Sequence, residues 1–300
     1  MIKNFEEIIK SAKAKGPKTI AVAVAEDIEV LSAVNSAKAL GIANAILIGD
    51  KDEILKVAGQ SGVELIDYEV VDIKDKNEAC RYAVELVSTG KAHIVMKGLV
   101  DTSMILKAVL DEKIGLRTGN VLSHVAIFDI NGYDRLFYVT DAAMNLAPNL
   151  EQKKQIIENA VQVAHALEND NPKVAALCAV EKVNPKMQAT VDAAELVKMN
   201  EEGILKGCIV GGPFALDNAV SAEAAKHKGI NHPVAGQADI LMVPTIEAGN
   251  MLYKSIVFFA KGNNAGIIVG AKAPIVLTSR ADSDIAKLNS IAIGVLMASK

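Results

Sequence analysis

Short runs of β-branched and other apolar residues alternate along this chain with longer segments in which apolar residues recur at helical spacing. Continuous apolar runs predict buried strands, and the 3.6-residue repeat predicts helices. Strands are expected at 19–25, 45–49, 63–71, 93–96, 123–130, 135–140, 174–180, 207–210, 240–243, 266–269 and 275–278. Helices are expected at 28–40, 53–59, 76–89, 104–110, 150–167, 187–199, 217–228, 248–261 and 285–296. This alternation predicts an α/β fold with helices on both faces of parallel strands.

One part of the chain departs from the alternation of strand and helix. Two expected strands flank Asn131-Gly132, and Asn-Gly between apolar runs is the strongest short signal of a β-hairpin. A chain of 300 residues is at the upper limit for one hydrophobic core, so two α/β domains are expected. We place the first domain in residues 1–129 plus 273–300 and the second in residues 130–272. No Pro- or Ser-rich linker occurs, so strands or short loops should join them.

Composition argues against several kinds of partner. The formal net charge is −4 without a block of Lys or Arg, so nucleic acid is not an expected partner. No apolar run approaches the ~20 residues that span a membrane, and residues 1–18 lack a signal-peptide pattern. Cys80, Cys178 and Cys208 form no CxxC pair, which is typical of reduced thiols in a cytoplasmic protein. The histidines form no HxxxH or HExxH pair, so no metal site is expected.

The residues that follow the expected strand 275–278 are the strongest candidates for chemistry. Ser279, Arg280 and Asp282 lie where that strand leads into the last helix, and open α/β sheets bind ligands at this edge. A hydroxyl, a guanidinium and a carboxylate can hydrogen-bond a reacting oxygen, hold an anion and accept a proton. The alternative is that Ser279, Asp282 or Ser283 caps the last helix and that Arg280 is a surface residue.

Further polar or glycine-containing segments follow other expected strands. They contribute the candidate substrate- and phosphate-binding residues Lys97, Gly98, Arg117, Thr118, Gly212, Glu247 and Asn250. A lysine beside a helix N-terminus, or a guanidinium beside a hydroxyl, can hold an anion, and glycine lets the backbone approach a ligand closely. Helix caps and ordinary turns are the alternative explanation. The glycines form neither a P-loop nor a dinucleotide-binding fingerprint.

Motifs spread over essentially the whole chain resemble those of phosphate acetyltransferases and phosphate butyryltransferases. In order, they are Asp141-Ala-Ala-Met-Asn-Leu-Ala-Pro148, Gly212-Pro-Phe-Ala-Leu-Asp217, Pro244-Thr-Ile-Glu-Ala-Gly-Asn250 with Tyr253-Lys254, and Ala273-Pro-Ile-Val-Leu-Thr-Ser-Arg280. Each motif is modest, but four in order are highly specific. The continuation Ala281-Asp282-Ser283 looks like the butyryl branch, as do Met96-Lys97-Gly98 and Gly115-Leu-Arg-Thr-Gly119.

The resemblance implies an acyltransferase that interconverts butyryl-CoA plus phosphate with butyryl phosphate plus CoA. It implies two α/β domains with the site in a cleft between them, similar to isocitrate and isopropylmalate dehydrogenases. CoA, acyl-CoA, phosphate and acyl phosphate would be substrates, with no resident cofactor and no metal. The family also implies a homo-oligomer, a dimer or larger.

The resemblance also implies roles for individual residues. Asp282 would take the proton of the CoA thiol, with Asp284 as the reserve because the spacing differs from that of the acetyl branch. Ser279 and Arg280 would stabilise the carbonyl oxygen as the thiolate attacks. The phosphate would lie against Arg117, Thr118 and the backbone near Gly98.

Three alternatives stay open at this point. The first is a phosphate acetyltransferase or a broader short-chain phosphotransacylase, because a methylene in an apolar pocket changes binding by only about 1–3 kcal/mol. The second is an NAD-dependent decarboxylating dehydrogenase on the same fold, which needs clustered metal-binding aspartates, whereas Asp217 and Asp239 are isolated. The third is a non-catalytic CoA-binding domain.

Overall fold

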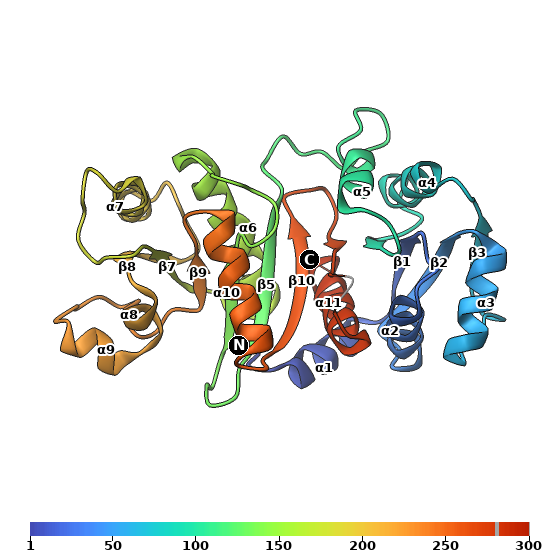
Figure 1. Ribbon diagram of the computed structural model, residues 1–300, viewed down its shortest axis with the longest axis horizontal. Coiled ribbons are helices and arrows are strands. Elements are labelled where there is room, and N and C mark those ends of the chain that lie inside the picture. The colour runs from blue at the N-terminus through green and yellow to red at the C-terminus, as the bar shows by residue number, and fades with distance from the viewer. Residues whose placement is uncertain (280–281, 300) are drawn as a thin grey trace. The chain divides into compact units, whose positions relative to one another are not determined.

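The computed structural model describes residues 1–279 and 282–299 (Figure 1). The chain divides into two compact units. The first unit consists of Phe5–Asn120 and the chain from Ala265 on, and the second consists of Val121–Asn264 with Met1–Asn4. The sequence prediction placed the joints after residues 129 and 272.

The first unit contains a mixed β-sheet. Its strands are β1 (Lys18–Ala23), β2 (Ala43–Gly49), β3 (Glu69–Asp72), β4 (Ile94–Lys97), β10 (Asn263–Val269) and β11 (Ile275–Val276), in the order β3-β2-β1-β4-β11-β10. β1 is parallel to β2 and β4, β2 to β3, and β4 to β11, but β10 is antiparallel to β11. Parallel neighbours need a crossover of a dozen or more residues, and the connection 270–274 is too short for one. The sheet is therefore mixed rather than purely parallel.

Helices cover both faces of this sheet. They are α1 (Phe5–Lys15), α2 (Ile28–Ala39), α3 (Lys51–Ser61), α4 (Lys76–Ser88), α5 (Thr102–Val109) and α11 (Asp284–Met297). α4 packs with α5 on one face, and α11 packs with α1 and α2 on the other (Figure 1). The side chains of Asp27, Asp50, Asp75 and Ser283 accept backbone N–H groups at the starts of α2, α3, α4 and α11. These caps explain why each helix begins directly after a strand or loop.

The strand order of the first unit changes direction between β1 and β4. β2 and β3 follow on one side of β1, and β4 returns to its other side. Ligands of open α/β sheets bind beyond the carboxyl ends of the strands at such a point. Here Val24 has a φ of 58°, and a Cβ on Gly98 would lie 2.0 Å from the Val24 carbonyl oxygen. Only glycine fits at residue 98, because the two strand ends are in close contact.

The second unit also combines strands with helices. Its strands are β5 (Ser123–Asp129), β6 (Leu136–Thr140), β7 (Lys173–Leu177), β8 (Ile209–Phe214) and β9 (Ile240–Met242), in the order β5-β6-β9-β7-β8. Its helices are α6 (Leu150–Ala166), α7 (Gln188–Glu201), α8 (Leu216–Val220), α9 (Ala222–His227) and α10 (Ile246–Phe258). β5 and β6 pair antiparallel, which confirms the hairpin predicted from Asn131-Gly132. Gly132 supplies the turn with a φ of 92°.

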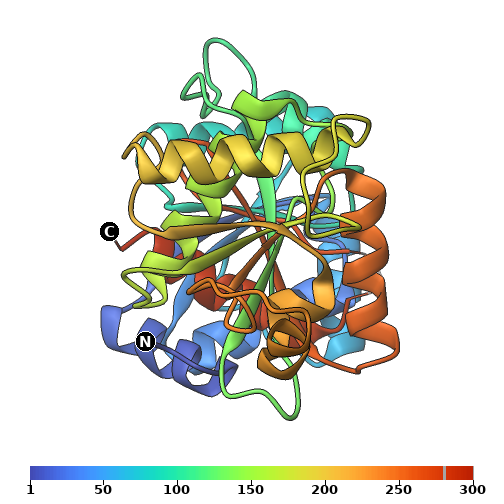
Figure 2. The ribbon, with the colours of Figure 1, turned by 90° about the vertical axis from the view of Figure 1, so that its left-hand side faces the viewer.

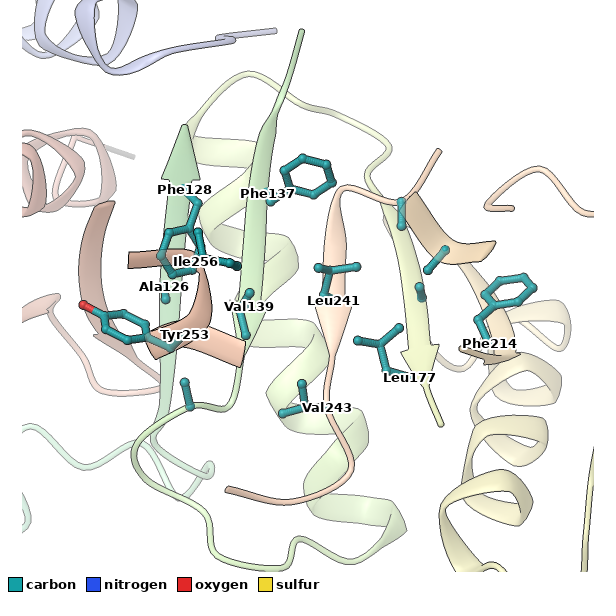
Figure 3. Packing of buried hydrophobic residues seen from close by; sticks show 14 of the residues in the cluster. Ala126, Phe128, Phe137, Val139, Leu177, Phe214, Leu241, Val243, Tyr253 and Ile256 are labelled. Carbon is teal, nitrogen blue, oxygen red and sulfur yellow. The ribbon is translucent and has the colours of Figure 1, made fainter. Parts of the chain in front are cut away.

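Buried apolar side chains from the strands and from α10 form the core of the second unit (Figure 3). Phe128 of β5, Val139 of β6 and Leu241 of β9 are all fully or almost fully buried. Tyr253 of α10 packs edge-on against Phe128 with ring centroids 5.3 Å apart, an arrangement that aromatic pairs prefer. This contact holds α10 against the sheet and thereby fixes the position of residues 246–250.

Two predicted elements differ from the observed ones. The strand expected at 63–71 is confined to β3, because a turn in which the Tyr68 N–H donates to the Leu65 carbonyl precedes it and exposes Ile66. The helix expected at 217–228 is broken at Ser221, which has extended backbone and accepts the Ala224 N–H. Serine hydroxyls compete with helical hydrogen bonds in this way, so α8 and α9 are separate.

Candidate functional site

Ser279 and Asp282 lie between β11 and α11 and are joined by two hydrogen bonds, a pairing that we call the Ser279–Asp282 turn. The Ser279 N–H donates to Oδ2 of Asp282 over 2.7 Å, and the Asp282 N–H donates to the Ser279 carbonyl over 3.1 Å. The N-cap of α11 is Ser283, whose Oγ accepts the Ala286 N–H. Capping therefore accounts for Ser283 but not for Ser279 and Asp282. The third predicted member of this site, Arg280, lies outside the described residues.

The two aspartates proposed as bases have different surroundings. Asp282 is part of the turn, and its carbonyl accepts a hydrogen bond of 2.6 Å from Nζ of Lys287. Asp284 is exposed in the first turn of α11, where its Oδ1 accepts the N–H of Ile285. The described contacts thus join Ser279, Asp282 and Lys287, while Asp284 interacts within its own helix.

Lys287 is a site residue that the sequence analysis missed. Its side chain is buried, at 3% exposure, although the residue belongs to the first turn of α11. A signal for this burial was present, because Lys287 lies four residues before Ile291 and eight before Val295 on the same helical stripe. The sequence analysis instead began the apolar repeat at Ile285, which is 60% exposed.

Lys97 ends β4 at the point where the strand order reverses. Its side chain is buried, and its ammonium donates to the carbonyls of Gly98 and Val100 over 3.1 Å each. A buried ammonium needs such acceptors, and these hold the loop that leads into α5. The contacts give Lys97 a structural explanation, and the close approach of Gly98 to Val24 does the same for Gly98.

The Arg117–Thr118 segment is attached to the start of β11. Oγ1 of Thr118 donates to the Gly270 carbonyl over 2.5 Å, and the Lys272 N–H donates to the Leu116 carbonyl. Arg117 has a side chain that is 54% exposed and lies 3.8 Å from Glu112, so it is accessible to an anion. Thr118 therefore contacts the connection 270–274 between β10 and β11, whereas Ser279 follows the carboxyl end of β11.

The candidates of the second unit surround the loop that follows β6. Asn250 is exposed, and its Nδ2 donates to the Ala142 carbonyl of this loop over 3.5 Å. Glu247 is exposed in the first turn of α10, where its own N–H and the Thr245 hydroxyl hold the pKa of its carboxyl below the ordinary value. Gly212 packs on β7, because a Cβ there would lie 3.0 Å from the carbonyl oxygen of Ala176.

Asp141 organises this loop. It is buried, and its Oδ1 accepts the N–H groups of Ala143 and Met144 over 2.8 and 3.0 Å. Its Oδ2 accepts the side-chain amide of Asn145 over 2.6 Å and the Asn145 N–H over 3.2 Å. A Cβ on Gly249 would lie 2.4 Å from the Asp141 carbonyl oxygen. The motifs that begin at Asp141 and Pro244 are thus distant in sequence but packed together.

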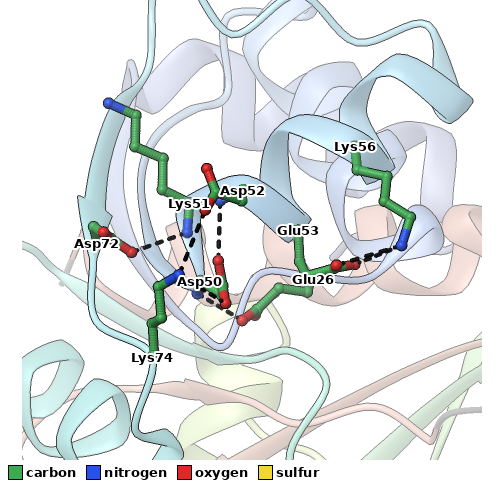
Figure 4. Close-up of polar contacts among 8 residues, drawn as sticks. All are labelled: Glu26, Asp50, Lys51, Asp52, Glu53, Lys56, Asp72 and Lys74. Atoms are coloured by element: carbon green, nitrogen blue, oxygen red, sulfur yellow. Dashed lines mark hydrogen bonds and ion pairs between the residues drawn. The ribbon is translucent and has the colours of Figure 1, made fainter.

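A second polar cluster lies beyond the carboxyl ends of β1, β2 and β3 (Figure 4). Oε1 of Glu26 accepts the Asp50 N–H over 2.7 Å, and Lys74 lies 3.5 Å from Asp50 and 3.4 Å from Asp52. The negative charge of Asp50, together with Asp52, raises the pKa of Lys74. Because Lys74 pairs with both aspartates and the Asp50 side chain caps α3, we assign the cluster to the structure of this edge.

The cysteines are poorly suited to carry an acyl group. Burial raises the pKa of the Cys80 and Cys178 thiols to about 11 and that of Cys208 to about 12. The thiolate is the nucleophilic form, so these thiols are almost entirely unreactive near neutral pH. This favours direct transfer between bound substrates over an acyl-cysteine intermediate.

Two absences hold for residues 1–279 and 282–299. In this range, no group of three or more His, Cys, Asp or Glu side chains is placed to hold a metal ion. Within the same residues, no helix is long and apolar enough to cross a membrane.

The fold is similar to those of solved phosphotransacylases. The crystal structure of a branched-chain phosphotransacylase from Enterococcus faecalis has a TM-score of 0.81 and 36% identity, covering 94% of this chain and 99% of that one. The class defined by the fold is therefore that of the phosphotransacylases.

The sequence comparisons narrow this class to a family. The model of the phosphate acetyl/butaryl transferase family matches residues 4–83 and 76–295. A phosphate butyryltransferase from Clostridium beijerinckii is 52% identical over 300 residues, which cover 100% of this chain and 99% of the relative. The chain belongs to the phosphate acetyl/butaryl transferase family.

The predicted likeness to isocitrate and isopropylmalate dehydrogenases is wrong. Besides phosphotransacylases, the similar structures include a 4-hydroxythreonine-4-phosphate dehydrogenase from Klebsiella pneumoniae, with a TM-score of 0.57, 13% identity, and coverage of 94% of this chain and 99% of that one. At this identity the likeness concerns the fold alone. The likeness to isocitrate and isopropylmalate dehydrogenases was implied by the family resemblance, and nothing in the order of strands and helices along the sequence tested it.

Proposed function

We propose that this chain is an acyltransferase that interconverts butyryl-CoA plus phosphate with butyryl phosphate plus CoA. The observation that carries the proposal is the 52% identity to a phosphate butyryltransferase along the whole length of both chains. The turn formed by Ser279 and Asp282 after β11 supports it, since it places a hydroxyl and a carboxylate at a strand end of an α/β sheet.

The chemistry needs a base, donors for the carbonyl oxygen and a group that holds phosphate. A CoA thiol with a pKa near ~8.5 is mostly protonated at neutral pH, and Asp282 takes its proton. The thiolate attacks the carbonyl carbon of butyryl phosphate, and Ser279 and Arg280 donate to the oxygen on which charge develops. The tetrahedral intermediate then expels phosphate, which the exposed Arg117 attracts.

Acyl-chain preference is the first test. Under the same assay conditions, kcat/KM for butyryl-CoA should exceed kcat/KM for acetyl-CoA by about tenfold or more, because each buried methylene of the acyl chain stabilises the bound transition state. The measurement is phosphate-dependent CoA release from acetyl-, propionyl-, butyryl- and isobutyryl-CoA. An enzyme as fast or faster with acetyl-CoA would be a phosphate acetyltransferase. Absence of phosphate-dependent release with every substrate would refute acyl transfer to phosphate.

We also propose that the enzyme is a homo-oligomer whose copies meet through α10, the orange helix at the right of Figure 2. Glu247, Met251, Lys254 and Phe258 are alternately four and three residues apart, which is the spacing of a helix-pairing seam. Met251 is 65% exposed and Phe258 64%, an apolar exposure that favours a partner. In an antiparallel pair centred between Asn250 and Met251, Glu247 would face Lys254 of the second copy.

Acidic residues in the seam should separate the copies. The variant carrying Met251→Glu and Phe258→Glu is expected to be monomeric at a concentration where the wild type is dimeric or larger, because four carboxylates would then meet at one interface. Light scattering after size exclusion gives the mass. Ile66→Glu, at an 88% exposed residue of the first unit, is the matched control and should keep the wild-type mass. A monomeric wild type, or an unchanged double variant, would contradict this arrangement.

A further inference from the structure

Lys287 occupies a position that is unfavourable for a lysine in two respects. It lies in the first turn of α11, where the positive end of the helix dipole repels a cation. Its side chain is also 3% exposed, and burial of an ammonium is costly unless acceptors surround it. The neighbouring buried positions of α11 are mostly apolar, so helix packing alone gives no reason for a lysine here.

The contacts of the Lys287 ammonium point to the turn that carries the proposed catalytic residues. Nζ of Lys287 donates to the backbone carbonyl of Asp282 over 2.6 Å. Within the described residues, this carbonyl is the acceptor of the ammonium. The ammonium has three N–H bonds and a full charge, so a short bond to a carbonyl is a charge-assisted one. The hydrogen bond to the Asp282 carbonyl thus offsets part of the free energy required to bury the Lys287 ammonium.

That backbone group belongs to the residue that closes the turn. Asp282 accepts the Ser279 N–H with its carboxylate, donates its own N–H to the Ser279 carbonyl, and accepts from Lys287 with its carbonyl. Lys287 therefore links Asp282 to α11, and α11 is itself held to β10 by Ser290, whose Oγ accepts the Gly266 N–H.

We propose that Lys287 is a positioning residue for acyl transfer: its buried ammonium fixes the backbone of Asp282, so that the Asp282 carboxylate and Ser279 keep their places during the reaction. The inference rests on the proposed function. Lys287 acts through Asp282 and does not itself need to touch substrate.

Lys287→Met tests this role because methionine keeps the length of the side chain and removes the donors. We expect kcat to fall roughly 10- to 100-fold, as misplacement of reacting groups does, with KM for CoA and for butyryl phosphate within about threefold of wild type. The melting temperature should be unchanged or higher, since apolar replacement of a buried charge is often neutral or stabilising. Loss of activity without loss of stability is not what a structural lysine would give.

Ser290→Ala is the matched control in the same helix. Ser290 is fully buried, accepts the N–H of Gly266 in β10 and donates to the carbonyl of Ala286 in its own helix, so these bonds do not involve the Ser279–Asp282 turn. This variant should lower the melting temperature and leave kcat within about twofold of wild type. If both variants lose activity in proportion to their loss of stability, or if Lys287→Met keeps wild-type kcat, the positioning role is refuted.

Hydrogen exchange gives a readout that does not depend on activity. Amide exchange in the peptide 277–283 should be faster in Lys287→Met than in wild type and unchanged in Ser290→Ala. If wild type shows no phosphate-dependent CoA release but this exchange pattern is found, the proposed function fails while the anchoring of the turn by Lys287 holds. Unchanged exchange in Lys287→Met would overturn the anchoring whatever the activity.

Discussion

Replacing Asp282 by Asn is expected to lower kcat for butyryl-CoA formation from butyryl phosphate and CoA by about 10²- to 10⁴-fold. The amide oxygen of asparagine can still accept the Ser279 N–H, so the turn should persist while the proton acceptor is lost. The same factor should apply to the reverse reaction, because both directions pass through one transition state. Thioester formation followed at saturating substrates measures the effect.

The pH dependence separates loss of a base from loss of structure. A variant without a base relies on thiolate that is already present, and that fraction rises about tenfold per pH unit below the thiol pKa of ~8.5. The rate of Asp282→Asn should therefore climb steeply up to about pH 8.5, while wild type changes much less over the same range. A variant that is equally slow at every pH would argue that Asp282 only shapes the turn.

Asp284→Asn is the matched control for this experiment. Asp284 is exposed and interacts with the N–H of Ile285 in its own helix, so its loss should leave kcat within about threefold of wild type. If Asp284→Asn shows the large loss and Asp282→Asn does not, the base is Asp284 and the role of Asp282 is confined to the hydrogen bond with Ser279.

Local signals in the sequence predicted the parts of the fold that local physics controls. Asn131-Gly132 predicted the β5–β6 hairpin because few residues adopt the backbone angles of that turn, and Gly132 has a φ of 92°. The alternation of strands and helices likewise predicted an α/β fold. The antiparallel pairing of β10 with β11 was not predicted, although the short connection 270–274 contained the information.

The predicted site was harder to evaluate from residue types alone. Lys97 and Gly98 are predicted anion-binding residues; the Lys97 ammonium also donates to two backbone carbonyls of its own loop, and Gly98 is required by the approach of Val24. A sequence gives the residue type at a strand end, not the direction in which its side chain points. The ligand-binding roles of Lys97 and Gly98 stay predictions, while their structural roles are defined by these contacts.

Lys287 was not predicted because its residue type and its place in the helical pattern indicate opposite surroundings. A lysine in the first turn of a helix is usually solvated, so its residue type alone predicts an exposed side chain without a role in the site. The helical stripe that Lys287 shares with Ile291 and Val295 predicts instead that its side chain is buried. Lysine is rarely buried without a partner, so its burial points to a specific interaction. A charged residue at an apolar position of a helical pattern, as here, is therefore a candidate for a structural or functional role.

Lys153→Met is expected to have the largest effect on stability, lowering the free energy of unfolding by about 3–5 kcal/mol. Lys153 of α6 and Asp192 of α7 form an ion pair with Nζ and Oδ2 2.6 Å apart, and both side chains are 8% exposed. Without the lysine, Asp192 would be a buried charge that retains, among the described residues, the hydrogen bond of 2.8 Å from Nε2 of Gln188. Urea unfolding of both proteins, followed by circular dichroism, gives the difference.

A double variant distinguishes an uncompensated charge from a general packing defect. Lys153→Met combined with Asp192→Leu removes both charges, and apolar replacement of a complete buried pair is often neutral or stabilising. The double variant should therefore be more stable than Lys153→Met alone, recovering most of the loss, although it carries one more substitution. If the double variant is no more stable than Lys153→Met alone, the charges of Lys153 and Asp192 are not coupled. The stability of the α6–α7 contact then comes from the surrounding apolar side chains.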